Sequence, residues 1–444
     1  MEMTDNVKVI IKNPHGTLEA IESKSQAHRY IIGCALSDKP NKFTLKEMSQ
    51  DIEATISCLN SLGANISTNT SKKESDLLSN NDNQNNEISI EPIKIVRKKT
   101  ILDCNESGST FRFLLPLACA LESESIFVMK EGLAKRPIKD LYNQLIKNGC
   151  KLSIEGSLPF HTKGKLEASD YVLPGDVSSQ YISGLLMALP LLDRKSSISL
   201  SSTVESLGYI EMTLDMLKTF HIDIKVSSDF MKYEIEGNQK YISSSNVSIE
   251  KDWSNSAFFL AAGALSDKEI IIKGLNLESL QKDKMILDIL KKMGADIAID
   301  KTAISIKKKE LKALDIDVGQ IPDLVPILSI LCSLAKGTSK IYNAKRLRIK
   351  ESDRIESTYQ MLKALGADVT SGEDFLIIKG KPQLNGGQIN SFNDHRIAMS
   401  GAIAAIVSRE PVIIENAKAI NKSYPSFFDD FKKVGGQIQY TRRM

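Results

Sequence analysis

The chain repeats one pattern, in which a helix ends at a glycine and a run of alternating apolar and polar residues begins. The pattern occurs six times, as SLGANIS, KNGCKLSI, TFHIDIKV, KMGADIAI, ALGADVTS and KVGGQIQY. Successive turn residues lie 86, 72, 73, 72 and 69 residues apart, so one unit recurs along the chain, and the one long interval contains residues 67–87. A glycine in this place is the usual left-handed residue that follows a helix, so each copy predicts a helix end and then a strand. The predicted turn residues are Gly63, Gly149, His221, Gly294, Gly366 and Gly435.

A second pattern keeps the same spacing: a small or acidic polar cluster precedes a helix that is apolar on almost every side. An all-round apolar helix must be buried. In most copies a short β-rich run follows, then an amphipathic helix and the glycine turn. The repeating unit is therefore βαβαββ. The six apolar helices begin near Ser23, Glu106, Asp176, Asp252, Ile321 and Phe392.

Six such units exceed one ordinary hydrophobic core. We therefore predict an α/β fold of two domains, each with three βαβαββ units around buried central helices, like an inside-out α/β barrel. The first domain should span residues 22–243, and the second should combine residues 1–21 with 244–444. We expect the active site in the cleft between them.

Three local segments complete this prediction. Residues 7–11 should form a strand that pairs into the second domain, and residues 246–252 (NVSIEKD) should form a strand at the domain break. Residues 67–87 are rich in Ser, Asn and charge, which indicates a mobile insertion in a hairpin.

Composition limits the possible partners. The net charge of the 444-residue chain is only +3, so nothing draws the whole protein to nucleic acid or membrane, and anions must bind locally. Its apolar runs are too short to span a bilayer. The six cysteines include no CxxC pair, which indicates reduced, mostly buried thiols and a cytoplasmic protein. Scattered histidines make a poor ligand set, so we expect no metal and no cofactor.

The densest cluster of charge is RLRIKESDR, residues 346–354. One interpretation is a solvated helix start in which Lys350 and Arg354 share a face beside Glu351. The other is a clamp for phosphate and carboxylate, with Glu351 as a proton-transfer group.

Basic residues also occur at the starts of the apolar helices, where Lys24, Arg29, Arg112 and Arg396 lie. The polar residues there suit ordinary N-caps, but helix N-termini also attract anions. Capping alone does not predict basic residues in the same places, so the pattern favours an anion-binding site.

Ten motifs in order resemble the enolpyruvyl transferase family over nearly the whole chain. They are SKSQAHR, ESGSTFR, KRPI, GDVSSQ, ESLGYIE, DWSNSAFFLAAGAL, IPD, RIKESDR, NDHRIAM and NKSYPSFF. The family's fold has two domains of three βαβαββ units. The resemblance implies an enzyme of the shikimate pathway that transfers the enolpyruvyl group of phosphoenolpyruvate to the 5-hydroxyl of shikimate 3-phosphate and releases phosphate.

The resemblance also implies roles for individual residues. The phosphoenolpyruvate site would comprise Lys24, Arg136, Gln180, Arg354, Arg396 and Lys422, with Gln180 touching both substrates. The shikimate 3-phosphate site would comprise Ser25, Arg29, Ser178, Ser179, Ser206 and Tyr209. Lys350 would complete the site, and Gly108 and Arg112 would line it.

Four residues are expected to act in the chemistry. Asp323 would hold and help to deprotonate the attacking hydroxyl, although a plain helix cap is its ordinary interpretation. Lys24 and Glu351 would move the proton at the methylene carbon. His395 would line and orient the site. Both substrates are small molecules, and we expect a monomer.

Two positions bear on specificity. Glu106 stands where the family often has asparagine, which puts one substrate contact in question. Gly108 is retained, so the resemblance implies that glyphosate competes with phosphoenolpyruvate.

Three alternatives remain. The sister enzyme that uses UDP-N-acetylglucosamine normally has a reactive cysteine before Arg-Pro, whereas this chain has EGLAKRPI. An RNA 3′-phosphate-processing protein could share the repeat, but the charge is near neutral and aromatic residues are only 6%. A catalytically dead scaffold is disfavoured by Lys24, Asp323, Glu351 and Arg396.

Overall fold

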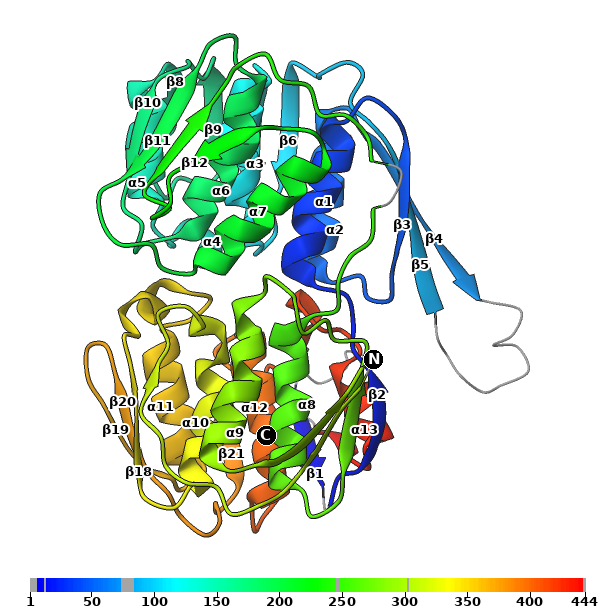
Figure 1. The fold of residues 1–444 in the computed structure, drawn as a ribbon, viewed down its shortest axis with the longest axis vertical. Helices are drawn as coiled ribbons and strands as arrows, with labels where there is room; N and C mark the ends of the chain where they lie inside the picture. Colours follow the sequence, from blue (N-terminus) through cyan, green and yellow to red (C-terminus); the bar gives the residue numbers. More distant parts are fainter. Residues whose placement is uncertain (1–5, 12, 73–83, 245–246, 302, 442–444) are drawn as a thin grey trace. The chain divides into compact units, whose positions relative to one another are not determined.

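The computed structural model describes residues 6–11, 13–72, 84–244, 247–301 and 303–441. The chain forms two compact units, Glu22–Ile249 (the first unit) and Met1–Ile21 with Glu250–Met444 (the second unit). Figure 1 follows the chain through both.

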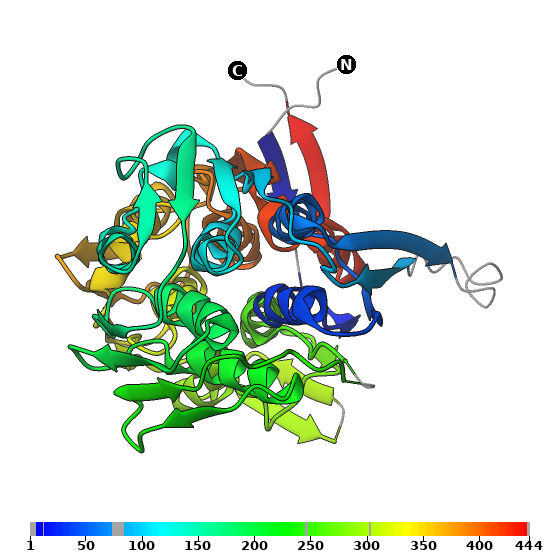
Figure 2. The same cartoon turned by 90° about the horizontal axis from the view of Figure 1, so that it is seen from above.

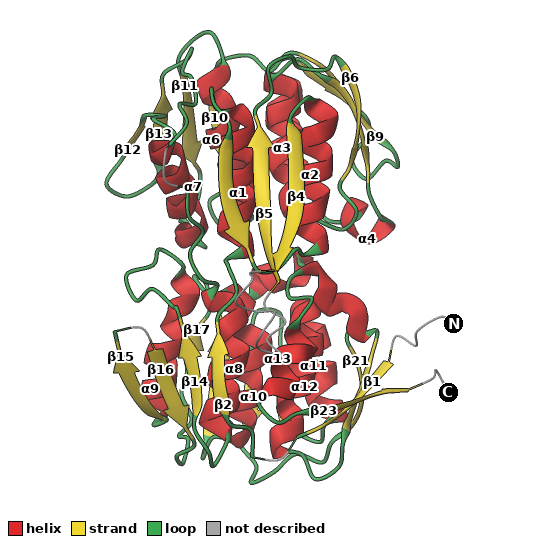
Figure 3. Cartoon of the chain, turned by 90° about the vertical axis from the view of Figure 1, so that its right-hand side faces the viewer, coloured by secondary structure: helices red, strands yellow, loops and turns green. Residues whose placement is uncertain are grey.

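The first unit places three buried helices inside three sheets. The inner helices are α1 (Lys24–Leu36), α3 (Gly108–Ala120) and α6 (Ser179–Ala188). The other helices are α2 (Gln50–Leu62), α4 (Glu131–Ala134), α5 (Lys139–Lys147), the 3-10 turn η2 (Leu189–Leu191) and α7 (Leu207–Thr219). Figure 3 shows strands of this unit lying over its helices.

The sheets of the first unit follow the repeat. One has the order β3 (Asn41–Leu45), β5 (Gln84–Glu91), β4 (Asn65–Lys72). The next is β6 (Lys99–Asp103), β7 (Glu124–Val128), β9 (Phe160–Gly164), β8 (Cys150–Leu152). The last is β10 (Asp170–Leu173), β11 (Ser196–Leu200), β13 (Lys232–Ile235), β12 (Ile224–Val226).

The second unit repeats this plan. Its inner helices are α8 (Trp253–Leu265), α10 (Val325–Leu334) and α12 (His395–Ala404). All thirteen residues of α8 are buried, as an apolar surface on every side requires. The other α-helices are α9 (Ile286–Met293), α11 (Arg354–Ala364) and α13 (Phe427–Lys433). The 3-10 turns are η3 (Lys282–Met285), η4 (Pro322–Leu324), η5 (Lys345–Ile349), η6 (Ala405–Val407) and η7 (Ala417–Lys422).

Two sheets of the second unit borrow strands from the start of the chain. They run β15 (Asp296–Asp300), β16 (Ala303–Lys307), β14 (Ile270–Lys273), β2 (Gly16–Glu19), and β21 (Gly387–Asn390), β22 (Val412–Glu415), β1 (Asn6–Ile10), β23 (Gln437–Thr441). The third is β17 (Ile316–Asp317), β18 (Thr338–Tyr342), β20 (Leu376–Lys379), β19 (Asp368–Ser371). In Figure 2, β1 and β23 lie side by side near the two termini, so the predicted pairing of the first strand is confirmed.

The predicted glycine turns are confirmed by the backbone. All six turn residues have a positive φ, including His221 at 60° in place of a glycine. In every unit, therefore, a residue with positive φ ends the helix and leads into the next strand.

Two local predictions need correction. Residues 247–250 form no strand; Val247 and Ile249 instead pack against the first unit's core. The region 67–87 is less irregular than predicted, because β4 and β5 pair as far as Lys72 with Gln84. Residues 73–83 lie outside the described part of the chain.

All six cysteines are buried and unbridged. No helix within the described residues combines the length and the apolar character needed to cross a membrane.

Candidate active site

Inner helices of both units begin at capping side chains. Ser23, Ser107, Ser178, Asp252 and Asp394 each accept a hydrogen bond from a backbone N–H of the following turn, at 2.7–3.4 Å. The capping interpretation is therefore correct for these five residues. Capping does not account for the charged side chains that gather at the same helix ends.

In the first unit, close helix packing brings Arg112 and Gln180 together. A Cβ on Gly184 would come within 2.4 Å of the Arg112 carbonyl oxygen, so only glycine lets α6 approach α3 this closely. One turn earlier on α6, the Gln180 carbonyl Oε1 accepts from Arg112 Nη1 at 2.9 Å. The Gln180 amide Nε2 donates to Ser109 Oγ at 2.9 Å. These two bonds fix the orientation of the Gln180 amide.

Two guanidinium groups flank the first residue of α3, Gly108. A Cβ there would lie 2.7 Å from Arg112 Nη1 and 2.8 Å from Arg136 Nη1. The bare glycine therefore leaves room for both cations beside the N-terminus of α3, where backbone N–H groups also favour anions.

Lys24 opens α1 and forms an ion pair with Asp51 in the first turn of α2, Nζ to Oδ2 at 2.8 Å. Both side chains are mostly buried, and the Asp51 carbonyl accepts from Thr110 Oγ1 at 3.3 Å. Sequence reasoning missed Asp51, because an acidic residue in a helix's first turn is an ordinary surface feature.

Arg29 is a buried cation that is surrounded by neutral groups. Only 2% of it is exposed. Its guanidinium donates to Thr213 Oγ1, Ser183 Oγ and the carbonyl oxygens of Ser25 and Tyr209. Among the described residues no carboxylate lies within ion-pair distance of it. Burial lowers the pKa of Arg29 to about 10.

Three of the predicted serines lie at the starts of α6 and α7, and the fourth, Ser25, is the second residue of α1. Ser178 caps α6, and Ser179 is its first residue. Ser206 precedes α7 with φ 54° and without a side-chain capping bond. A serine in the left-handed region is uncommon and marks a backbone constraint.

Glu106, the departure from the family pattern, reaches toward the start of α4. Its Oε2 lies 3.9 Å from Lys130 Nζ, and its side chain is only 16% exposed while the lysine is 63% exposed.

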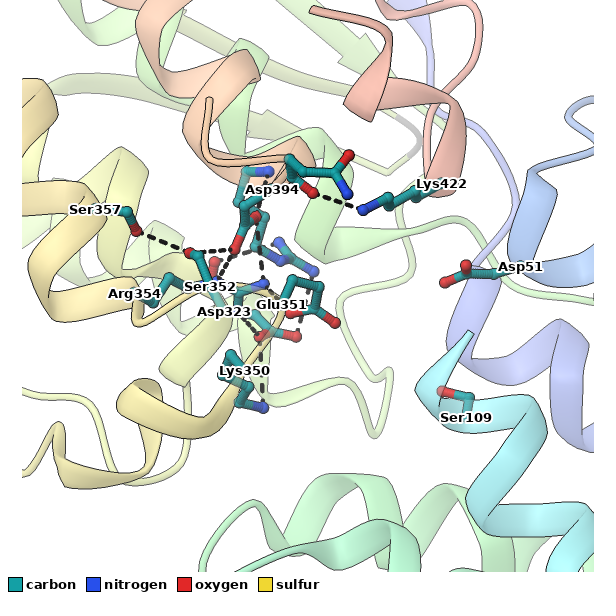
Figure 4. Close-up of polar contacts among 12 residues, drawn as sticks. Asp51, Ser109, Asp323, Lys350, Glu351, Ser352, Arg354, Ser357, Asp394 and Lys422 are labelled. Atoms are coloured by element: carbon teal, nitrogen blue, oxygen red, sulfur yellow. Dashed lines mark hydrogen bonds and ion pairs between the residues drawn. The ribbon is translucent and has the colours of Figure 1, made fainter. Parts of the chain in front are cut away.

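In the second unit, Arg354 lies among three carboxylates (Figure 4). Its Nε donates to Asp394 at 2.8 Å, Nη1 to Asp323 at 2.7 Å, and Nη2 to Glu351 at 2.5 Å. Burial disfavours the charged guanidinium, but the three carboxylates more than compensate and hold the pKa of Arg354 above its usual range. The solvated-helix interpretation of residues 346–354 is therefore wrong for Arg354, which is 1% exposed. Lys350 precedes α11 instead of sharing its face.

Asp323 in η4 is the centre of this cluster. Besides Arg354, its carboxylate accepts from Arg396 Nη2 at 3.2 Å and lies 3.8 Å from Lys350 Nζ. Burial would raise the pKa of Asp323, but Arg396, Lys350 and Arg354 together hold it well below its usual range. The carboxylate is therefore ionised at neutral pH.

Two neighbours of Asp323 titrate close to neutrality. Burial, opposed by Asp323, lowers the pKa of Lys350 to about 8. Burial and the charge of Asp323 raise the pKa of Asp283, in η3, to about 7. Asp283 was not predicted from the sequence, because nothing in KDKM indicates a buried carboxyl group.

The remaining predicted residues of this unit lie around α12. Asp394 caps the helix, and His395 is its first residue and is 3% exposed. Lys422, at the end of η7, donates from Nζ to the Asn393 carbonyl at 2.6 Å (Figure 4). Asn393 and Phe392 both have positive φ, which brings this carbonyl beside Lys422.

Solved structures share the fold. EPSP synthase from Acinetobacter baumannii aligns with a TM-score of 0.78 at 24% identity, over 98% of this chain and 99% of that one. The enolpyruvyl transferase NikO from Streptomyces tendae aligns with a TM-score of 0.77 at 13% identity, over 99% of both chains. The fold is that of the enolpyruvyl transferases.

Sequence comparison identifies the family more narrowly than the fold does. A model of the family described as EPSP synthase (3-phosphoshikimate 1-carboxyvinyltransferase) matches residues 9–431. Proteins named 3-phosphoshikimate 1-carboxyvinyltransferase are 42% identical in Clostridium novyi, over 98% of both chains, and 43% identical in Clostridium acetobutylicum, over 95% of this chain and 96% of that one. The chain belongs to the EPSP synthase family. The predicted transferase family and α/β repeat fold are confirmed, and the UDP-N-acetylglucosamine and RNA alternatives are not favoured.

Proposed function

We propose that the clusters in the two units serve one addition–elimination reaction between phosphoenolpyruvate and the 5-hydroxyl of shikimate 3-phosphate. Each cluster supplies part of what the reaction needs. The first unit offers cations and small hydroxyl groups, and the second offers carboxylates held among cations.

The buried cation Arg29 is the observation that best supports this proposal. A buried charge is costly unless it is paired, and the described partners of Arg29 are neutral. An anionic substrate would supply the missing charge. We assign Arg29 to shikimate 3-phosphate, together with Ser25, Ser178, Ser179, Ser206 and Tyr209.

We assign the remaining cations to phosphoenolpyruvate. Arg136 and Lys24 belong to the first unit, and Arg354, Arg396 and Lys422 to the second. Gln180 has an amide held in one orientation by Arg112 and Ser109, which suits it to hydrogen-bond both substrates. Charged donors fixed before the substrate arrives lose little free energy to reorganisation when it binds.

In the first chemical step the 5-hydroxyl oxygen adds to C2 of phosphoenolpyruvate and a proton adds to C3. The ionised carboxylate of Asp323 accepts a hydrogen bond from the attacking 5-hydroxyl. It then helps to remove the proton of that hydroxyl. Lys24 and Glu351 move the proton to C3. The cations of the site balance the phosphate and carboxylate charges.

In the second step the bond between C2 and the phosphate oxygen breaks and releases phosphate. A proton leaves C3, and the C2–C3 double bond of the enol ether forms. Glu351 is the proposed acceptor, and the hydrogen bond that its carboxylate accepts from Arg354 Nη2 holds it in place. His395 lines the site and orients substrate. We further propose that the protein is a cytoplasmic monomer that uses no metal.

The test is phosphate release by the purified protein from phosphoenolpyruvate with shikimate 3-phosphate, beside a parallel reaction with UDP-N-acetylglucosamine. We expect release with the shikimate ester alone. Asp323→Asn and Glu351→Gln should each reduce kcat by about 10²–10⁴. Arg29→Gln should raise the KM for shikimate 3-phosphate more than that for phosphoenolpyruvate. Release with the nucleotide sugar alone would overturn the proposal.

A further inference from the structure

Arg136 lies in a short link rather than in a helix or strand. The link joins Lys135, at the end of α4, to Ile138, which precedes α5. No ladder of helix or sheet hydrogen bonds holds such a segment in place, so its position depends on individual contacts. A guanidinium that must meet a substrate phosphate nevertheless needs a fixed position, because small displacements of a binding group are costly.

Each residue from Arg136 to Ile138 is held by a hydrogen bond of its backbone. The Arg136 N–H donates to the Leu133 carbonyl at 3.0 Å, which ties the link to α4. The Ile138 N–H donates to Glu155 Oε1 at 2.7 Å. Between them Pro137 has no N–H, so its carbonyl is its only backbone hydrogen-bonding group. That carbonyl accepts from the Tyr181 hydroxyl at 2.5 Å.

Tyr181 comes from the helix that carries Gln180, and it is 1% exposed. Its ring lies beneath Arg112, with the guanidinium carbon 5.9 Å from the ring centroid. Burial raises the pKa of Tyr181, so the hydroxyl stays protonated and able to donate. One side chain therefore contacts Arg112 through its ring and the Arg136 link through its hydroxyl.

Both arginines meet at Gly108, where an added Cβ would touch Nη1 of each. We infer that Tyr181 is a positioning residue, which holds Arg136 beside Arg112 so that the two guanidinium groups form one preorganised anion site for phosphoenolpyruvate. This inference rests on the proposed role of Arg136.

The variant that tests it is Tyr181→Phe, which removes the hydroxyl and keeps the ring. The KM for phosphoenolpyruvate should rise about fivefold to tenfold, the equivalent of one lost hydrogen bond. The KM for shikimate 3-phosphate and kcat should each change by less than about twofold, because the loss acts on substrate binding and not on the reacting atoms.

Tyr171→Phe is the matched control. The Tyr171 hydroxyl also donates to a backbone carbonyl, that of Glu167, at 2.5 Å, and Tyr171 is fully buried in β10. Both variants should show a similar small fall in melting temperature, with kinetics measured well below it. Only Tyr181→Phe should raise the KM for phosphoenolpyruvate. An equal KM for phosphoenolpyruvate in the two variants would overturn the inference.

A double-mutant cycle separates this inference from the assignment of Arg136. Arg136→Ala should raise the KM for phosphoenolpyruvate, and adding Tyr181→Phe should then raise it by less than about twofold, since no Arg136 side chain remains to be positioned. If Tyr181→Phe raised the KM for phosphoenolpyruvate as much in the Arg136→Ala background as in wild type, the proposed role of Tyr181 would be overturned. If wild type is active and Arg136→Ala leaves that KM unchanged, the proposed role of Arg136 fails, and the positioning inference fails with it.

Discussion

Arg354 and Asp394 form an ion pair that is almost entirely buried, with Nε 2.8 Å from Oδ2 and side-chain exposures of 1% and 0%. The same carboxylate caps α12 by accepting from the Arg396 N–H at 2.9 Å. One aspartate therefore joins the starts of α11 and α12. This connection fixes Arg354 relative to Arg396, and both arginines also bind Asp323.

Asp394→Asn keeps an oxygen for the helix cap and removes the charge. Breaking a buried pair is costly, although Arg354 retains two other carboxylates. The free energy of unfolding should fall by about 2 kcal/mol, as measured by denaturant unfolding. Asp353→Asn is the control, because Asp353 caps α11 and pairs with Arg348 at 2.8 Å but is 39% exposed. That variant should lose less than about 0.5 kcal/mol. If the free energy of unfolding fell equally in the two variants, burial would not explain the contribution of the Arg354–Asp394 pair.

Gly108→Ala should weaken phosphoenolpyruvate binding. The new methyl group would collide with Arg112 and Arg136 and displace both guanidinium groups. The KM for phosphoenolpyruvate should rise at least about tenfold, with a small effect on shikimate 3-phosphate. Glyphosate should compete with phosphoenolpyruvate in the wild type, and its inhibition constant should rise in the variant.

The control for this change is Gly132→Ala in α4, where a Cβ would make only an ordinary contact with Glu106, at 3.9 Å. Its steady-state kinetics should match those of wild type. If Gly108→Ala also matched wild type, the crowding of the two arginines would have no functional consequence.

Asp283→Asn should change how stability depends on pH. The pKa of Asp283 is about 7 in the folded protein and 3.8 in the reference state. Between these values the folded state binds this proton more tightly, so the contribution of Asp283 to wild-type stability falls as pH rises from about 4 to about 7. Asparagine cannot ionise. The variant should melt a few degrees higher than wild type at pH 8 and should gain nothing at pH 4.

Asp288→Asn, at an exposed position of α9, provides the comparison for Asp283. Melting temperatures of the three proteins should be recorded from pH 4 to pH 8. A constant difference between Asp283→Asn and wild type across that range would show that Asp283 is ionised throughout.

The repeat architecture could be predicted from the sequence because each unit carries local signals. His221 illustrates this, since its position in the repeat was enough to predict the left-handed backbone conformation that it adopts. Burial of Arg354 could not be predicted from RLRIKESDR, because the buried carboxylate that binds its Nε lies forty residues later, at the cap of another helix. Asp51 and Asp283 were missed for the same reason: their environments are created by packing, and neither has a distinctive neighbour in sequence.

Lys350 should set the alkaline limit of activity. Its pKa is lowered to about 8 by burial and by Arg346 and Arg354, against the opposing effect of Asp323. In the proposed site the protonated form of Lys350 attracts phosphoenolpyruvate, and this form is lost as pH rises through 8. The kcat/KM for phosphoenolpyruvate should therefore fall about tenfold per pH unit above that point.

Lys350→Arg tests this assignment because a guanidinium stays charged over the whole range. The alkaline fall should disappear below about pH 10, even if the geometry of arginine lowers activity at every pH. Lys345→Arg is the control, since Lys345 is 77% exposed and pairs with Glu373 at the surface. Its pH–activity profile should follow that of wild type.

The effect of Lys350 on stability should depend on pH in the opposite direction to its effect on activity. Between pH 8 and 10.5 the Lys350 side chain holds its proton more tightly in the unfolded chain than in the folded one. Across that window Lys350 should make wild type progressively more stable relative to Lys350→Arg, while wild type loses activity and the variant does not. If wild type unfolded over the same pH range in which its activity falls, alkaline unfolding rather than the titration of Lys350 would account for the loss of activity.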